Sequence, residues 1–247
     1  MSWHPHKEVT VERMIACIGW WLFALAALLT LVGTAGNLIA SHSYIVPLTL
    51  KPGYSTHVDV FHLQSDYVDL DLWHTYEKDQ ERPELGTYSH EKRPQGYYVD
   101  DPGQPVIIQV STAIDTVIYE AGPQAGRGSL HITRRMTPQA PDDNPKLFGG
   151  PDQPKQATLP RGRSALSFTV LQAGPALLGE EVQLHLEPPL TFKYTSSSYE
   201  WLWMFYFWPV FVAGLVLWAL GLAYMSWHVR DLPPPIPRMK NGRKEKP

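Results

Sequence analysis

The chain has 247 residues, one cysteine and a formal net charge of −3 at pH 7, and 44% of its residues are hydrophobic. The single cysteine, Cys17, excludes a disulfide within the chain, and the weakly acidic balance argues against nucleic-acid binding. Two long uncharged apolar runs divide the chain into five segments. These segments are residues 1–13, 14–35, 36–200, 201–227 and 228–247.

The first run, residues 14–35, contains no charged residue and no histidine, and it is long enough to cross a bilayer as a helix. Lys7 and Arg13 precede it, so residues 1–13 are predicted to form a short cytoplasmic head. A cleaved signal peptide is the alternative, because Gly33-Thr34-Ala35 loosely fits a cleavage site. The length of the run and the acidic residues before it favour a retained anchor.

The middle segment, residues 36–200, carries 20 acidic and 13 basic residues. Polar and apolar residues alternate with a period of two in its short stretches, and Pro-Gly or Gly-Pro turns separate them, which is typical of an all-β domain. We therefore predict an extracytoplasmic β-sandwich, immunoglobulin-like or jelly-roll-like. The candidate strands are Tyr44–Leu50, His57–Leu63, Tyr67–His74, Pro105–Ser111, Asp115–Glu120, Ser129–Arg135, Ala165–Leu171, Glu181–Glu187 and Leu190–Tyr194.

Two long loops interrupt this pattern, at residues 77–101 and 137–160. The first is rich in tyrosine and mixed charge, a composition that suits a protein-binding surface. A solvated loop without a partner is the alternative reading. The second loop is rich in proline, aspartate and glycine and is predicted to be a spacer. The candidate partner-binding residues are Arg82, Tyr88, Arg93, Tyr97 and Tyr98.

The middle segment contains seven histidines, and Asp66, Asp69 and Asp71 form its densest acidic group. No two histidines have the His-x-His or His-x3-His spacing of a chelating pair, and calcium usually takes more oxygen donors from a loop. The serines Ser196 to Ser198 and the glycines near Gly126 lack the surrounding residues of a nucleophile elbow or a phosphate loop. We therefore expect no catalytic residue, no metal site and no cofactor, and hence no enzyme.

The second run, residues 201–227, is also long enough to cross a bilayer. Pro209 is expected to kink it, and Gly214 and Gly221, seven residues apart on one face, are predicted to pack against another helix. Aromatic rings that favour the head-group level mark both ends of this run. They are Trp201, Trp203, Tyr206 and Trp208 at the outer end and Tyr224 and Trp227 at the inner end.

Residues 228–247 form a basic, proline-rich tail, which the excess of Lys and Arg places in the cytoplasm together with the head. The chain is thus expected in a bacterial inner membrane, with residues 36–200 in the periplasm and lipid and a protein as partners. The first functional hypothesis is a non-catalytic accessory subunit of a membrane assembly. The alternatives are a membrane-anchored binder of immunity type, which neutralises a toxin or inhibits an enzyme, and a sensor read through its tail.

Overall fold

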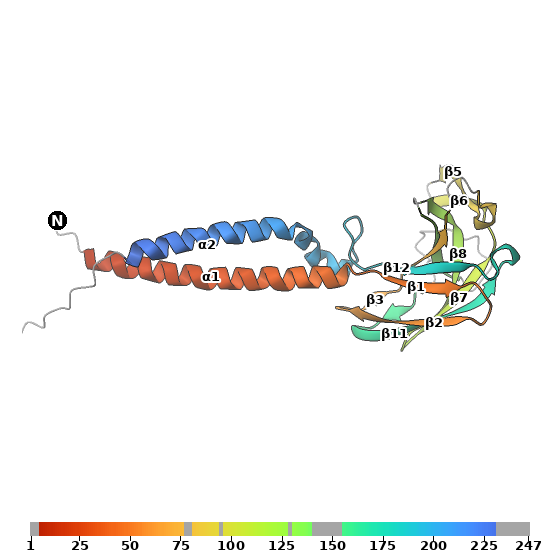
Figure 1. Cartoon of the computed structure of the whole chain (residues 1–247), viewed down its shortest axis with the longest axis horizontal. Helices are drawn as coiled ribbons and strands as arrows, with labels where there is room; N and C mark the ends of the chain where they lie inside the picture. The colour runs from red at the N-terminus through yellow and green to blue at the C-terminus, as the bar shows by residue number, and fades with distance from the viewer. Residues whose placement is uncertain (1–4, 77–80, 94–95, 128–129, 140–154, 231–247) are drawn as a thin grey trace, which may run out of the picture. The chain divides into compact units, whose positions relative to one another are not determined.

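The structure of the protein is a computed structural model that describes residues 5–76, 81–93, 96–127, 130–139 and 155–230. The chain divides into two compact units (Figure 1). Gly36–Trp203 make up the β unit, and the segments up to Ala35 and from Met204 onward make up the helical unit. Two long apolar helices therefore flank a β domain, as the sequence predicts. The head residues 1–4, the spacer residues 140–154 and the tail residues 231–247 lie outside the described part.

The helical unit contains the greater part of α1 (Pro5–Ala40) and all of α2 (Trp208–Arg230). A 3₁₀ segment, η3 (Ser197–Phe207), leads into α2. Residues 13–40 and 197–228 are long and apolar enough to cross a membrane. Pro209 is the second residue of α2, so it lies at the junction between η3 and α2 and not in the middle of the α-helix.

Within the helical unit, α1 approaches the second helical segment closely at two glycines. A side chain at Gly19 would meet Leu222, and one at Gly33 would overlap the ring of Phe205. Small residues permit such close approach between helices. Most of the remaining large apolar side chains of both helices are exposed, as expected of surfaces that face lipid or another apolar partner.

Eight strands of the β unit form one antiparallel sheet in the order β1-β12-β4-β9-β8-β7-β11-β2. Two further strand pairs, β3 with β10 and β5 with β6, lie outside it. The strand bounds are β1 Tyr44–Thr49, β2 Ser55–His62, β3 Asp66–Tyr67, β4 Leu70–Thr75, β5 Thr87–Arg93, β6 Gly96–Asp101, β7 Val106–Ser111, β8 Thr116–Arg127, β9 His131–Pro138, β10 Thr158–Leu159, β11 Gly162–Ala173 and β12 Glu181–Leu186.

The sheet curls so that its two ends approach each other. Its outermost strands, β1 and β2, are consecutive in sequence and lie side by side (Figure 1). The hydroxyl of Tyr44 in β1 accepts a hydrogen bond from the N–H of Phe61 in β2, at 3.1 Å. Register shifts in β8, between Ala121 and Gln124 and again before Gly126, mark bulges of the kind that bend a strand. The result is a nearly closed, barrel-like domain.

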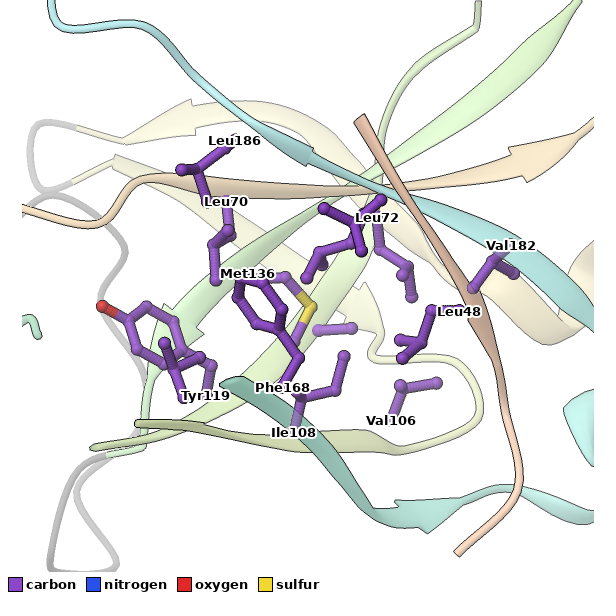
Figure 2. Close-up of a cluster of buried hydrophobic side chains, with 14 of the residues drawn as sticks. Leu48, Leu70, Leu72, Val106, Ile108, Tyr119, Met136, Phe168, Val182 and Leu186 are labelled. Atoms are coloured by element: carbon purple, nitrogen blue, oxygen red, sulfur yellow. The ribbon is translucent and has the colours of Figure 1, made fainter. Parts of the chain in front are cut away.

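The inward-facing side chains fill this enclosure (Figure 2). They follow the period-two pattern of the sequence, so that Leu70 and Leu72 of β4 point inward beside Ile108 and Phe168 from the far side of the sheet. The sequence thus predicts the β class and most strand positions correctly. The immunoglobulin or jelly-roll sandwich is not confirmed, because the hydrogen bonding joins the eight strands in a single sheet.

Two further local predictions were wrong. Residues 77–101 are not only a loop, because they contain the short 3₁₀ helix η1 (Pro83–Leu85) and the β5–β6 hairpin. Residues 190–194 are not a strand: the N–H of Thr191 donates to the carbonyl of Tyr194 and closes a tight turn. The hydroxyl of Thr191 also accepts from the N–H of Tyr194, which stabilises the turn locally.

The two ends of the β unit are joined at its base. The N–H of Leu190 donates to the carbonyl of Ala40, and the side-chain amide of Asn37 donates to the carbonyl of Leu202 at 3.1 Å. The buried hydroxyl of Tyr199 exchanges hydrogen bonds of 3.0 Å with both backbone groups of Gln64. The segments that lead into the two helices are therefore held to each other and to the turn after β2.

Candidate functional site

Three neighbouring strands, β12, β4 and β9, carry an outward-facing group of polar and aromatic side chains. Alternation along each strand places these side chains on the side opposite the apolar core. We call this group the polar face. Its members in the strands are Asp71, Trp73, His131, Arg135 and His185. Asp69 immediately precedes β4 and Glu187 immediately follows β12, and the N–H of Glu187 donates to the carbonyl of Asp69 at 3.0 Å.

An aromatic stack forms one part of the polar face. The indole of Trp73 lies between two imidazoles, with centroid distances of 4.1 Å to His131 and 4.2 Å to His185 and interplanar angles of 12° and 20°. The two histidines come from the strands on either side of β4. This stacking restricts the rotation of both imidazoles. Burial, together with the neighbouring His131, lowers the pKa of His185, so its ring is neutral near pH 7.

Acidic side chains gather beside this stack. Asp71 lies directly across from His185 in the β4–β12 pairing, and Glu187 follows on the same face. One ligand atom from each of these three residues lies within 4.8 Å of the others. Burial, and then the nearby Glu187 carboxyl group with which it shares a hydrogen bond, raises the pKa of Asp71 to about 7.

Arg135 of β9 borders the acidic group. Its guanidinium donates to a carboxylate oxygen of Asp69 at 2.7 Å. Burial raises the pKa of Asp69, although the charge of Arg135 acts in the opposite direction. Among the described side chains, the Arg135 guanidinium therefore faces three carboxyl groups, those of Asp69, Asp71 and Glu187.

A second polar cluster, which we call the end cluster, consists of His74, Arg82, Glu84 and Glu180 at one end of the domain. His74, fully buried, continues the inward row of Leu70 and Leu72, and its Nδ1 lies 3.1 Å from a carboxylate oxygen of Glu180. Arg82 donates to the other oxygen of Glu180 at 2.9 Å and also contacts Glu84. Burial lowers the pKa of His74. Burial of Glu180 acts to raise its pKa, but the hydrogen bonds from His74 and Arg82 outweigh this and lower it.

Arg134 is the largest fully buried side chain of the described residues. It follows the inward positions of β9, and its guanidinium donates to four backbone carbonyl groups. These belong to Gly122 at 2.7 Å, Gln104 at 2.9 Å, Ala121 at 3.1 Å and Pro102 at 3.3 Å. Burial lowers the pKa of Arg134 to about 10, so it remains charged at neutral pH. It fastens the bulge of β8 to the turn that follows β6.

Of the candidate partner-binding residues, the structure describes the side chains of Arg82 and Tyr88. Arg82 is bound to Glu180 within the end cluster. Tyr88 of β5 is half-buried, and burial raises the pKa of its phenol, near Arg135, Arg134 and Asp71. The backbones of Arg93, Tyr97 and Tyr98 belong to the β5–β6 hairpin, but their side chains are not among those that the structure describes.

The residues predicted at the membrane interface divide between η3 and α2. Trp201, Trp203 and Tyr206 lie in η3, whereas Trp208, Tyr224 and Trp227 lie in α2. Tyr224 and Trp227, each 72% exposed, are near the end of α2 that is farther along the chain. The Nε1 of Trp203 donates to the carbonyl of Phe192 at 3.2 Å, and the two rings are in contact.

Gly214 and Gly221 do not contact α1. Nothing described lies within 4 Å of a Cβ placed at either residue, so within the chain the close approach uses Gly19 and Gly33 instead. Packing of Gly214 and Gly221 against a helix of another subunit stays a prediction.

Local sequence patterns do not predict the polar face, because no single strand carries a chelating pair of histidines. The side chains of the polar face instead converge from adjacent strands. The sequence does hold two signals, Asp69-x-Asp71 and His185-x-Glu187, since a spacing of two puts both side chains of a pair on the same face of a strand. Their meeting depends on the β4–β12 pairing, which no local pattern predicts.

Comparison with known proteins gives little. No family model matches the chain, and no curated protein matches it. One solved structure, of a protein from Sulfurospirillum deleyianum, is similar at 15% sequence identity, covering 60% of this chain and 97% of that chain with a TM-score of 0.38. With so low a TM-score, this likeness says nothing further about fold or function.

Proposed function

We propose that the protein is a non-catalytic accessory subunit of a bacterial inner-membrane assembly, with a periplasmic β domain that contacts a protein partner. The observation that carries the proposal is the pair of long apolar helices, which leave most of their large apolar side chains exposed after packing on each other. Such surfaces require lipid or the helices of a partner. Lys and Arg flank both runs on the sides away from the β domain, which supports cytoplasmic termini.

The joined base of the β unit also supports a structural role. Hydrogen bonds from Leu190 to Ala40 and from Asn37 to Leu202 tie together the two segments that lead into the helices. A domain connected to a membrane segment at each of its two ends has less conformational freedom than one on a single flexible linker. This restriction lowers the entropy cost of binding a partner at a fixed place in an assembly.

The test is the recovery of a partner from native membranes. The full-length chain, tagged and extracted in lipid nanodiscs, is expected to copurify with another membrane protein in fixed stoichiometry by native mass spectrometry. Gly214→Leu together with Gly221→Leu should weaken this association. Nothing described in the chain lies within 4 Å of a Cβ at either glycine, so this space is available to a helix of a partner. Val216→Leu is the matched control, since it adds bulk on the opposite side of the helix from Gly214. Recovery of the chain alone from native membranes would refute the proposal.

The immunity-type binder predicts a different result. A binder acting through residues 77–101 would retain its target after Gly214→Leu and Gly221→Leu, but would lose it when the β5–β6 hairpin is replaced by a short turn. The same copurification experiment with these two variants therefore separates the two functions.

A further inference from the structure

We propose that Asp71, His185 and Glu187 bind a divalent transition-metal ion on the polar face of the β domain. The three residues offer two carboxylates and one imidazole, a donor set that suits Zn²⁺ and its first-row neighbours. The proposal does not depend on the accessory-subunit function, since it concerns only side chains within the β unit.

The strand pairing places the three ligands together. Asp71 and His185 are direct partners in the antiparallel β4–β12 pairing. Glu187 lies two residues beyond His185, just after β12, and its N–H donates to the carbonyl of Asp69. Their ligand atoms all lie within 4.8 Å of one another. Ligands about 2.0–2.2 Å from a zinc ion are themselves about 3–4 Å apart, so a contraction of roughly 1 Å completes the geometry. Rotations of the aspartate and glutamate side chains supply a contraction of this size.

The imidazole is held in place for such a role. The ring of His185 stacks on Trp73, and the other face of Trp73 stacks on His131. The Nδ1 atom of His185 is enclosed and has no hydrogen-bond partner among the described residues. A nitrogen donor favours transition metals over Ca²⁺ and Mg²⁺, which prefer oxygen ligands only.

The surrounding charges are compatible with a dication. Two carboxylates offset the charge of the ion, while Arg135 is directed to Asp69 by its 2.7 Å hydrogen bond. Asp69 lies on the same face as Asp71, so its carboxylate, fixed by Arg135, borders the ligand group. Three protein ligands leave a fourth position for water or for a donor from another molecule.

The experiment measures Zn²⁺ binding to the full-length chain in detergent after treatment with a chelator. Calorimetry is expected to give one Zn²⁺ per chain. His185→Gln, Asp71→Asn and Glu187→Gln should each weaken binding at least about tenfold, because even partners in the outer shell of a metal site contribute that much. His57→Gln and Asp59→Asn are matched controls: both side chains are exposed on β2, and their substitution should leave the affinity unchanged.

A spectroscopic measurement separates loss of ligands from loss of folding. Co²⁺ bound to the wild-type chain should show visible absorption bands that His185→Gln removes, while His131→Gln, which alters only the far side of the Trp73 stack, retains them. Circular dichroism in the presence of chelator confirms that each variant is folded. The proposal is overturned if the wild type shows no saturable binding of one ion, or if folded His185→Gln binds Zn²⁺ as tightly as the wild type.

Discussion

At the scale of single residues, the inward-facing charged side chains of the β unit are notable because burying a charge costs free energy. A buried guanidinium is tolerated only when its donors are matched by acceptors, and Arg134 meets this condition with four backbone carbonyl groups. The neighbouring Arg135 points to the other face, where its side chain is 54% exposed. Two adjacent arginines of one strand thus have opposite environments.

Arg134→Met should destabilise the β unit by about 3–5 kcal/mol, because it leaves buried carbonyl groups without donors. Arg135→Met, with the same change of side chain, should cost less than about 1 kcal/mol, since it removes one exposed ion pair. Chemical denaturation of the full-length variants in detergent, followed by near-ultraviolet circular dichroism, measures both. Similar losses for the two variants would contradict the role given to the buried guanidinium.

His74 predicts a pH dependence of stability. Its pKa is lowered by burial below the ordinary value of 6.5, so below pH 6.5 the unfolded chain takes up a proton that the folded chain does not. The stabilisation due to His74 is therefore complete above that pH and declines as the pH falls through and below 6.5. His74→Asn removes this titration, so the variant should lose less stability than the wild type between about pH 8 and about pH 5. Parallel losses, measured by thermal melting, would contradict the assignment.

At the scale of elements, two tight turns interlock beside the end cluster. Gly86, which ends η1, and Gly103, which follows β6, both have positive φ values, of 76° and 71°. Each backbone occupies the space where a side chain of the other would lie. The N–H of Gln104 also donates to the carbonyl of Glu84 at 2.7 Å, which joins the two turns.

Gly86→Ala should therefore be more costly than Gly179→Ala. Both glycines have positive φ, 76° and 84°, so both substitutions carry backbone strain. The ψ of 175° at Gly86 also puts its backbone in a region that is essentially restricted to glycine, where a side chain costs about 1–3 kcal/mol. Only at Gly86 does the added methyl group also overlap backbone atoms, whereas nothing lies within 4 Å at Gly179. The overlap should add about 1–3 kcal/mol to the loss of stability in denaturation of the two full-length variants. Equal losses of stability for Gly86→Ala and Gly179→Ala would contradict the tight packing of the two turns.

Sequence patterns and structure agree where the information is local. Alternation predicts the buried rows of β4 and β7, and the uncharged runs predict both apolar helices. Alternation also puts His74 and Arg134 in line with apolar neighbours, which indicates that their side chains face inward. Local patterns do not predict the closure of the sheet, because it depends on which strands distant in sequence pair with each other. The same holds for the polar face, where His185 and Asp71 meet only after β12 pairs with β4.

At the scale of the whole molecule, the proposed membrane topology rests on the two apolar helices and on the Lys and Arg residues that flank them. The single cysteine makes this simple to test, because Cys17→Ser leaves a chain without thiols. In that background, Ala113→Cys places a thiol at an exposed turn of the β unit, and Asn241→Cys places one in the tail.

A maleimide that does not cross membranes should label Ala113→Cys in spheroplasts, in which only the inner membrane remains as a barrier. It should label Asn241→Cys only after that membrane is permeabilised, because the proposed topology, which rests on the excess of Lys and Arg, puts the tail in the cytoplasm. The Cys17→Ser chain without an introduced cysteine reports background labelling. Labelling of Asn241→Cys in intact spheroplasts would contradict the proposed topology.

The pairing of β1 with β12 has a consequence for biosynthesis. Residues 44–49 are among the earliest of the β unit to be synthesised, yet their partners are residues 181–186, close to its end. During translation β1 must wait for almost the entire domain before its backbone groups are satisfied, and pairing over such a separation is slow. An unpaired early strand is open to wrong partners. A nascent chain stalled before residue 181 should consequently remain sensitive to proteases and depend on chaperones, and resistance should arise only once the final strand emerges.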